Sequence, residues 1–359
     1  MWDPKKPFNE LPPPPTERLE SRAVLKAIAP ARAALGALDQ AVYRIPNPGV
    51  LLSNIPLLEA QASSEIENIV TTTDDLFQFA DSPESSKNAA TKETLRYRSA
   101  LFAGEENIRN RPLTAKTAEL VCSKIQGHDV SVRSHEGTYI GDPSTRQPRY
   151  TPPTGKRLLQ KKLHEWEVFV HEAANAGVDP LVVMAAAHYQ FEAIHPFSDG
   201  NGRTGRILNV LILLELGLLH EPVLYLSRYI IEHKQDYYDH LLSVTRDDDW
   251  ENWLLFILEG VRATSRRTLK LIDGIEDLRG SVREELRSLG KTAANLDLLD
   301  VLFEQPYCRI TSVMERCDVS RPTATNWLRE LRALGVLDEV KLGREVLFVN
   351  TQLMQILGQ

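Results

Sequence analysis

Hydrophobic residues recur at helical spacing along most of this chain. Alanines and leucines predict a first helix over residues 17–38, and the sequence IPNPG at 45–49 ends that pattern. The next apolar stripe predicts a helix over about residues 54–70, with Ser53 or Asn54 as its N-cap and Pro56 in its first turn. The members of this stripe are spaced 3, 4, 4 and 3 residues apart: Ile55, Leu58, Ala62, Ile66 and Ile69.

Later segments continue the helical pattern. Asp179 is a suitable N-cap and Pro180 a suitable first residue for a helix that ends near Ile194. Residues 1–15 are polar and proline-rich and predict an extended arm, whereas residues 81–90 predict a loop. The other expected helices begin at Lys92, Thr114 and Gly155, or cover about 203–219, 232–245 and 248–287.

Two segments depart from the helical pattern. VRSHEGTYIGDPSTRQPRYTPP, residues 132–153, is rich in Gly, Pro, Ser and Thr and predicts an exposed hairpin or flap. From Leu296 onward, the sequence predicts a helix, a short turn and a second helix, and LDEVKLGREVLFV then predicts a β-hairpin. Two helices followed by a two-stranded wing are typical of a winged helix-turn-helix domain.

These changes of pattern divide the chain and give a mainly α fold class with one small β-hairpin flap. Residues 1–95 form an N-terminal helical region, and residues 96–262 form a helical core with the flap at about 131–150. Residues 263–290 form a helical linker to a winged-helix domain over residues 291–359.

The composition is that of an ordinary globular protein, with 42% hydrophobic and 25% charged residues. The formal net charge of −7 argues against a protein that coats nucleic acid, although it allows a local basic surface. The most apolar stretch, Ile207–Leu219, is too short to span a bilayer, and no signal-peptide pattern is present, so we expect a cytoplasmic protein. Three scattered cysteines without a CxxC pair favour buried free thiols in a reducing compartment.

Chemically versatile residues concentrate in HPFSDGNGRTGR, residues 195–206. GNGRTG matches a dinucleotide-binding loop, but that interpretation requires a preceding strand, and here a helix is expected. A kinase loop requires the companion H-R-D and D-F-G motifs, and this chain has neither. A Walker A loop needs lysine after its last glycine, where this chain has Arg206. The remaining interpretation is a glycine-rich loop that opens a helix, where converging backbone N–H groups and the helix dipole favour an anion.

Four side chains add phosphate-transfer chemistry to this loop. Arg203 and Arg206 are three residues apart, so both can project toward one anion and make bidentate phosphate contacts. Asp199 would repel phosphate unless Mg²⁺ bridges the two groups. A neutral imidazole at His195 suits a general base on an incoming hydroxyl. The set predicts nucleotidyl or phosphoryl transfer to an alcohol.

Other interpretations of the same residues exist. A glycine-rich loop is commonly only a turn, paired arginines commonly lie on a solvated face, and a single histidine is commonly a core residue. Their coincidence within twelve residues favours a catalytic site instead. His188, Glu192 and His195 follow the spacing i, i+4, i+7 and could share a zinc-binding helix face. Against zinc, Pro196 places His195 at or beyond the helix end, and no HExxH motif occurs.

HPFSDGNGRTGR resembles the signature of the Fic family, H-x-F-x-[D/E]-G-N-G-R-x-x-R, at every fixed position. The segments GTYIG, RYTPP and YLSRYIIEHKQDYYDHLL are also similar to Fic proteins, so the resemblance covers about residues 15–262. It implies an all-α Fic fold, with the winged helix as an appendage common in one bacterial branch. It also implies a protein adenylyltransferase, a nucleotidyltransferase that moves AMP from ATP to a Tyr, Thr or Ser hydroxyl and releases pyrophosphate.

The resemblance assigns roles by position. His195 would deprotonate the target hydroxyl, Phe197 would anchor the loop in the core, and Asp199 would hold Mg²⁺. The Asn201 side chain would contact the α-phosphate, and Tyr238 would pack near adenine. The ATP-binding residues would be Gly200, Asn201, Gly202, Arg203, Thr204, Gly205, Arg206 and Tyr238, with both arginines on the outer phosphates.

SSEIEN, residues 63–68, resembles the family's inhibitory motif, [S/T]-x-x-x-E-[G/N]. Ser63 and Glu67 are four residues apart and therefore share one face of the expected helix. The Glu67 carboxylate would pair with Arg206 and occupy the place of the γ-phosphate, so that ATP binds only in a pose unfit for attack. The alternative interpretation is an ordinary surface glutamate.

The expected partners follow from the same resemblance. The flap, about residues 135–150, would add a strand to the backbone of a target protein, and the chain would also modify itself. In the winged helix, Arg321, Arg329 and Arg332 could contact DNA phosphates. However, residues 291–359 hold eight basic and nine acidic residues, a net charge of −1, so protein docking or homodimer formation suits this domain at least as well.

Two classes of function stay open at this point. The first is the adenylyltransferase, and the second is a DNA- or nucleotide-responsive regulator in which the Fic site is a sensor. The complete set of His195, Asp199, Asn201, Arg203 and Arg206 favours the enzyme. Within the enzyme class, transfer of phosphate or phosphocholine and removal of AMP are alternatives, because they depend on ligand orientation.

Overall fold

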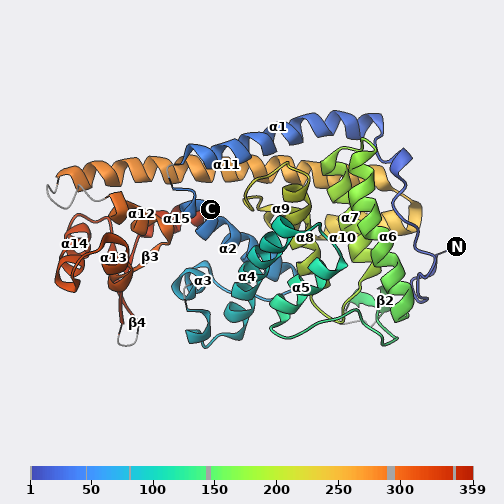
Figure 1. Ribbon diagram of the computed structural model, residues 1–359, viewed down its shortest axis with the longest axis horizontal. Coiled ribbons are helices and arrows are strands. Elements are labelled where there is room, and N and C mark those ends of the chain that lie inside the picture. Colours follow the sequence, from blue (N-terminus) through green and yellow to red (C-terminus); the bar gives the residue numbers. More distant parts are fainter. Residues whose placement is uncertain are drawn as a thin grey trace.

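A computed structural model of the protein describes residues 2–45, 47–80, 82–142, 147–288, 296–342 and 345–358, and it is mainly helical (Figure 1). The helices of the first 288 residues are α1 (Arg22–Arg44), α2 (Gly49–Ile66), α3 (Thr73–Phe79), α4 (Ala89–Asn110), α5 (Ala115–Gln126), α6 (Lys156–Asn175), α7 (Pro180–Ile194), α8 (Asn201–Glu215), α9 (Leu226–Glu232), α10 (Lys234–Asp247) and α11 (Trp250–Ser288). Two short 3₁₀ helices, η1 (Thr16–Arg18) and η2 (Pro83–Ser85), and two strands, β1 (Ile140–Asp142) and β2 (Gln147–Tyr150), complete this part. None of the described helices is both long and apolar enough to cross a membrane.

Helix α7 forms the centre of the core because nearly every one of its side chains is apolar and buried. It begins as the sequence predicts, with Asp179 Oδ1 accepting a hydrogen bond from the backbone N–H of Leu181 at 2.9 Å. The indole N–H groups of Trp166 and Trp253 donate to carbonyls of α7 at 3.0 and 2.8 Å. Helices α6, α8 and α11 pack around it, so the end of α7 is held firmly.

The long helix α11 runs side by side with α1 along one edge of the molecule (Figure 1). Ahead of them, residues 2–15 form an arm without helix or strand that lies on the helical core and contains turns. Leu11 of this arm is fully buried, its carbonyl accepts a hydrogen bond from Lys162 Nζ at 2.6 Å, and the carbonyl of Pro12 accepts one from Gln190 Nε2 at 3.0 Å. The predicted arm is therefore interrupted by turns and packs on the folded core.

Helix α2 differs from its prediction at both ends. It begins at Gly49, where Asn47 Oδ1 accepts the Gly49 N–H at 3.0 Å, so the prediction of a cap at Ser53 or Asn54 is wrong. Both residues lie within the helix, and both side chains are buried. The helix also ends at Ile66, and Glu67 is its C-cap residue, not a residue of a helix that continues to 70.

The predicted flap is confirmed as an antiparallel hairpin. Strand β1 pairs with β2 from Ile140 opposite Tyr150 to Asp142 opposite Gln147, while the predicted turn at 143–146 lies outside the described residues. The Tyr150 hydroxyl donates to the carbonyl of Ala193 at 2.8 Å, and Arg149 Nη2 lies 2.9 Å from Asp239 Oδ1. The hairpin is thereby fixed to α7 and α10.

The C-terminal part contains the predicted helix, turn, helix and hairpin. Its elements are α12 (Leu296–Glu304), β3 (Tyr307–Arg309), α13 (Ile310–Cys317), α14 (Arg321–Ala333), β4 (Asp338–Leu342), β5 (Glu345–Val349) and α15 (Thr351–Leu357), and the strands form an antiparallel sheet in the order β3-β5-β4. The tip of the predicted hairpin, residues 343–344, lies outside the described residues. We refer to residues 296–358 as the C-terminal domain, and it occupies one end of the molecule (Figure 1). The three cysteines are free and buried, as predicted.

Candidate active site

His195 is positioned by the end of α7. As the C-cap residue it adopts a left-handed backbone conformation, with φ 49° and ψ 59°, and its N–H donates to the carbonyl of Phe191 at 3.0 Å. The Arg133 side chain holds the far side, because its Nε donates to the His195 carbonyl at 2.8 Å and its Nη2 to the Pro153 carbonyl at 2.6 Å. The backbone that carries the imidazole is therefore fixed from α7 and from both ends of the flap.

Residues 196–200 form a tight loop that leads into α8. Phe197 is fully buried, as the resemblance implies. Asn201 Oδ1 accepts the Phe197 N–H and Asn201 Nδ2 donates to the Phe197 carbonyl, both at 2.8 Å. Both polar atoms of the Asn201 side chain thus bond the loop's own backbone, and the prediction that this side chain points at a phosphate is not met.

Arg206 makes the central charged contact of the site. Its Nη2 lies 2.8 Å from Glu67 Oε1, its Nε donates to Ser63 Oγ at 2.8 Å, and its Nη2 also donates to the Ser63 carbonyl at 2.9 Å. The contact expected between Glu67 and Arg206 is present. Burial lowers the pKa of Arg206, but Glu67, Tyr237 and Glu192 together outweigh burial and raise this pKa above its usual value, so the guanidinium stays charged.

Arg203 points elsewhere. Its buried guanidinium lies with Nη1 2.6 Å from Glu93 Oε1 of α4, so the prediction that both arginines face one anion is wrong for this conformation. Successive residues of a helix are turned by about 100°, which puts positions 203 and 206 on neighbouring but different faces of α8. The face of Arg203 packs on α4, and the face of Arg206 meets the end of α2.

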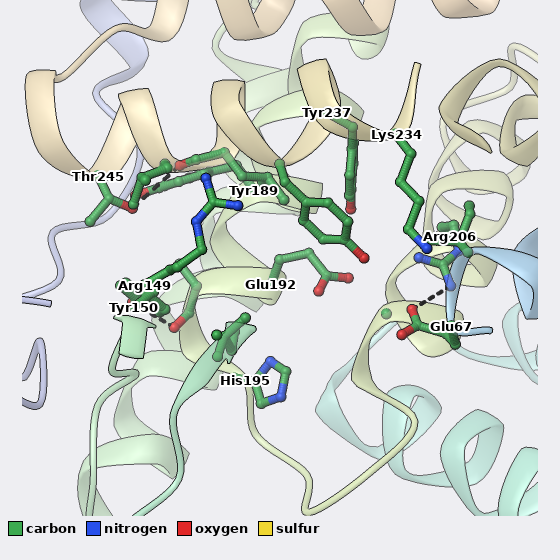
Figure 2. A pocket seen from close by; sticks show the side chains of 18 of the residues that line it. Glu67, Arg149, Tyr150, Tyr189, Glu192, His195, Arg206, Lys234, Tyr237 and Thr245 are labelled. Atoms are coloured by element: carbon green, nitrogen blue, oxygen red, sulfur yellow. Dashed lines mark hydrogen bonds and ion pairs between the residues drawn. The ribbon is translucent and has the colours of Figure 1, made fainter. Parts of the chain in front are cut away.

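The five residues Glu67, His195, Gly202, Arg206 and Tyr238 line one cavity of about 480 Å³, a size that suits a nucleotide-sized ligand (Figure 2). Its walls come from the end of α2, both flap strands, α7, α8 and α10. Seven other predicted residues do not line it: Ser63, Asp199, Gly200, Asn201, Arg203, Thr204 and Gly205. Of these, Ser63 acts through Arg206, and Asp199 stays exposed at the start of α8.

Apart from the phosphate contacts that the sequence predicts for them, Gly202 and Gly205 each leave space for a carboxylate. A Cβ atom at Gly202 would stand 2.3 Å from Glu67 Oε1, and one at Gly205 would stand 2.4 Å from Glu192 Oε1. Each glycine therefore makes room for a carboxylate on the surface of α8.

Glu192 is the main cavity residue whose role the sequence analysis missed. It was considered only as a zinc ligand, although a carboxylate in the otherwise apolar segment PLVVMAAAHYQFEAI, one turn before His195, was a usable signal. The pKa of Glu192 is raised to about 7. Burial is the main cause, Arg206 opposes the rise, and Glu67 adds to it. Lys234, Arg149, Tyr189 and Tyr237 also line the cavity and had not been assigned.

The imidazole of His195 is neutral at neutral pH. Burial and the charge of Arg133 lower its pKa to about 4, while Glu67, the Glu192 carbonyl and Asp199 act in the opposite direction. A neutral imidazole at a cavity wall can accept a proton, which is the property a general base needs.

A zinc site is not supported. His188 Nε2 lies 2.9 Å from the Tyr237 hydroxyl, and the ring stacks on Trp253 in the core. Burial is the main cause that lowers the pKa of His188, to about 3. Among the described residues, no three His, Cys, Asp or Glu side chains are grouped so as to hold a metal ion.

The three arginines predicted to contact DNA phosphates are divided between two positions. Arg332 Nη1 lies 2.7 Å from Glu339 Oε2 of the hairpin, so its charge is used within the domain. Arg321 and Arg329 instead line a shallow depression on α14 together with Pro322, Thr325 and Asn326.

Three family models match successive parts of the sequence. "Fic/DOC family N-terminal" matches residues 25–106, "Fic/DOC family" matches 120–213, and "Protein adenylyltransferase SoFic-like, C-terminal domain" matches 278–353. The chain belongs to the Fic/DOC family. The last match covers the end of α11 and nearly all of the C-terminal domain of this Fic protein.

Curated relatives include two mosquito proteins, each named protein adenylyltransferase Fic. Those of Aedes aegypti and Culex quinquefasciatus are each 33% identical to this Fic chain over 167 residues. The match covers 45% of this chain but only 30% of each mosquito protein.

Solved structures share the fold of this Fic protein. A Fic family protein from Desulfovibrio desulfuricans gives a TM-score of 0.54 at 19% identity over 94% of this chain and 98% of its own. A Fic domain containing signaling protein from Bacteroides thetaiotaomicron gives 0.52 at 18% identity over 68% of this chain and 95% of its own. The predicted mainly α Fic fold is thus confirmed.

Proposed function

We propose that this Fic protein is a protein adenylyltransferase, which transfers AMP from ATP to a Tyr, Thr or Ser hydroxyl of a target protein and releases pyrophosphate. The observation that carries the proposal is the single cavity that brings together the neutral imidazole of His195, the start of α8 and the buried guanidinium of Arg206. The mosquito relatives named protein adenylyltransferase support the same activity.

The chemistry assigned to the cavity is one displacement at phosphorus. His195 accepts the proton of the target hydroxyl as its oxygen forms a bond to the α-phosphorus of ATP, and the bond from that phosphorus to the pyrophosphate oxygen breaks. Arg206 binds the outer phosphates that leave, and the N-terminal end of α8 stabilises negative charge around the α-phosphate. Arg203 and Asn201 act through the shape of the loop, because their side chains bond Glu93 and the Phe197 backbone.

Mg²⁺ fits one position of this site. Asp199 is exposed and uses Oδ1 to accept the Gly200 N–H at 2.7 Å, which leaves Oδ2 directed to no partner among the described residues. Mg²⁺ in nucleotide sites is commonly held by one or two carboxylates, by phosphate oxygens and by water, so a single aspartate is sufficient. When bound, the ion would neutralise phosphate charge, and Asp199 would be its protein ligand.

Autoinhibition is the second part of the proposal. The Glu67 carboxylate occupies the position in which Arg206 would hold an outer phosphate of ATP, because one guanidinium cannot bond both groups in the same geometry. The Glu67 side chain is 36% exposed and belongs to the end of α2, whereas that of Arg206 is only 2% exposed. Glu67 is thus the partner that can leave, and in this proposal the site becomes active when it does.

The flap provides the place for a protein target. Ile140 and Gly141 of β1 line the same cavity as His195, and β1 pairs with only one strand in the described structure. An extended target segment that pairs with the free edge of β1 would bring its hydroxyl beside the imidazole.

Two labels on ATP test the activity. The chain would be incubated with ATP labelled either at the α- or at the γ-phosphorus, and protein-bound label would be measured for wild type, Glu67→Gly and Glu67→Gly with His195→Ala. AMP transfer predicts that only the α-label enters Glu67→Gly, that less of it enters wild type, and that the double variant takes up neither label. Incorporation of the γ-label would show phosphate transfer instead, and absence of both labels even without Glu67 would favour a regulatory role.

A further inference from the structure

Glu192 is an unused hydrogen-bonding group inside the cavity. It belongs to the last turn of α7, and its Oε1 is buried without a hydrogen-bond partner among the described residues. Figure 2 shows its carboxyl group between His195 and the pair formed by Glu67 and Arg206. A buried acceptor without a partner costs free energy, so its retention in a ligand cavity indicates that a ligand group bonds it.

The surroundings of Glu192 fix where this acceptor lies. Its Oε1 rests on the backbone of Gly205, where any larger residue would collide with it. Glu192 makes no ion pair within the described part of the chain, and Arg206, the cation that lowers its pKa, is already bonded to Glu67. The carboxyl group is therefore held in place by packing and remains available to a ligand.

The chemistry of a nucleotide leaves few groups that could bond Glu192. In its carboxylate form Glu192 repels a phosphate group and accepts hydrogen bonds only, so the ligand group that bonds it must be a donor. The donors of a nucleotide are its ribose hydroxyls and base N–H groups. His195, Gly202 and Arg206 mark the phosphate end of the cavity, while Leu241, Leu242 and Thr245 mark an end suited to a base. Glu192 precedes His195 by three residues, which is about 4.5 Å along the helix axis. The ligand group that reaches Glu192 therefore lies close to the phosphates, and in a nucleotide that group is the sugar and not the base.

We propose that Glu192 accepts a hydrogen bond from a ribose hydroxyl of the nucleotide and makes the site selective for ribonucleotides over deoxynucleotides. The inference rests on the proposed function, since it takes the cavity to be a nucleotide site. It assigns Glu192 a binding role that is separate from proton transfer at His195 and from inhibition by Glu67.

The test compares dissociation constants in a chain whose cavity is open. Glu67→Gly serves as the parent, and its affinities for ATP, 2′-deoxy-ATP and 3′-deoxy-ATP would be measured by titration calorimetry. The parent should bind ATP about 10-fold or more tightly than the analogue that lacks the bonded hydroxyl. In the parent carrying Glu192→Leu, that ratio should fall to about 1, whereas Glu192→Gln, which keeps an acceptor oxygen, should retain most of it.

The outcomes separate this inference from the proposed function. Equal affinity of the parent for all three nucleotides, or a ratio that Glu192→Leu leaves unchanged, overturns the role of Glu192 while the nucleotide site stands. Failure of every nucleotide to bind the parent overturns the nucleotide site itself. The comparison within the parent needs no change at Glu192, so equal affinities overturn the proposal even if the leucine variant does not fold.

Discussion

At the scale of single residues, the protonation state of His195 decides whether it can act as a base. The charged groups that influence its pKa are Arg133, Glu67 and Asp199, but burial is the strongest influence, and this pKa lies at about 4. The imidazole is therefore already neutral at pH 7 and needs no loss of a proton before it accepts one.

This account predicts the titration of His195. In protein with ¹³C-labelled histidine, the His195 Cε1 resonance should stay constant from pH 8 to about 5.5 and move only near pH 4. His195→Ala identifies the resonance by its loss. A resonance that titrates near pH 6.5 would contradict the buried, neutral state.

The same shift in pKa predicts how stability depends on pH. An unfolded histidine binds its proton below about pH 6.5, but folded His195 binds it only below about 4. The unfolded chain thus holds more protons in this range, so the free energy of unfolding should decrease as pH falls from about 6.5 to about 4. The difference in stability between wild type and His195→Ala, measured by urea denaturation across this range, should follow that decrease, and a pH-independent difference would contradict it.

The sequence alone located the cavity residues whose side-chain direction is set by the backbone at a helix end. It did not predict side-chain directions that depend on packing against other elements. The glycine-rich motif identified His195, Gly202 and Arg206 because a helix end and a helix start determine their place. It could not show that Arg203 turns to Glu93 or that Asn201 bonds the Phe197 backbone. Those directions depend on α4 and on the loop's own hydrogen bonds, which spacing does not encode.

At the scale of elements, α2 holds Glu67 in place through a buried carboxylate eight residues earlier. Glu59 is only 2% exposed, and it accepts hydrogen bonds from the Tyr97 hydroxyl at 3.1 Å, from the Ser227 N–H at 3.0 Å and from the Ser227 hydroxyl. Tyr97 belongs to α4 and Ser227 to α9, so this carboxylate joins three helices. Burial raises its pKa, and the hydrogen bonds and Arg206 act against that shift.

Replacing Glu59 should therefore loosen the contact between Glu67 and Arg206 that we propose to be inhibitory. Glu59→Ala leaves buried donors without an acceptor and should lower the free energy of unfolding by about 2–3 kcal/mol. It should also raise automodification with ATP and Mg²⁺ above the wild-type rate at a temperature where the variant is folded. Glu65→Ala on the exposed face of the same helix is the matched control and should change neither quantity. A stable variant with wild-type automodification would refute the positioning role.

Helical periodicity predicted most elements, but not their ends. The apolar stripe found α2, yet Asn54 looked like a cap although it is a buried residue with partners in another part of the chain. Helix α3, Thr73–Phe79, was not predicted, because seven residues are too few to show a clear period. Boundaries depend on tertiary hydrogen bonds that local pattern does not contain.

At the scale of the whole molecule, the C-terminal domain rests on α2, the helix that carries Ser63 and ends at Glu67. Asn54 Nδ2 of α2 lies 3.4 and 3.3 Å from the carbonyls of Phe303 and Glu304 at the end of α12, where helix carbonyls lack partners of their own. The Tyr307 hydroxyl also donates to Asp74 of α3. The sequence predicted the order of the domains, but it contained no sign that this domain docks on α2.

Asn54 should consequently stabilise the docking of the C-terminal domain. Asn54→Leu removes the side-chain amide that donates to the carbonyls at the end of α12. The free energy of unfolding, measured by urea denaturation, should therefore fall by about 1–3 kcal/mol. Asn110→Leu is the control, because Asn110 is exposed and its Nδ2 bonds only Glu106 of its own helix. Equal stability of wild type and Asn54→Leu would show that this contact does not hold the domain.

The central claim is that this chain transfers AMP and is restrained by the contact between Glu67 and Arg206. The most direct measurement is the intact mass of wild type, Glu67→Gly and Glu67→Gly with His195→Ala after incubation with ATP and Mg²⁺. We predict a mass increase of one or more AMP groups in Glu67→Gly, much less in wild type and none in the double variant. Equal modification of wild type and Glu67→Gly would contradict inhibition by Glu67, and no AMP on any of the three would contradict the proposed activity.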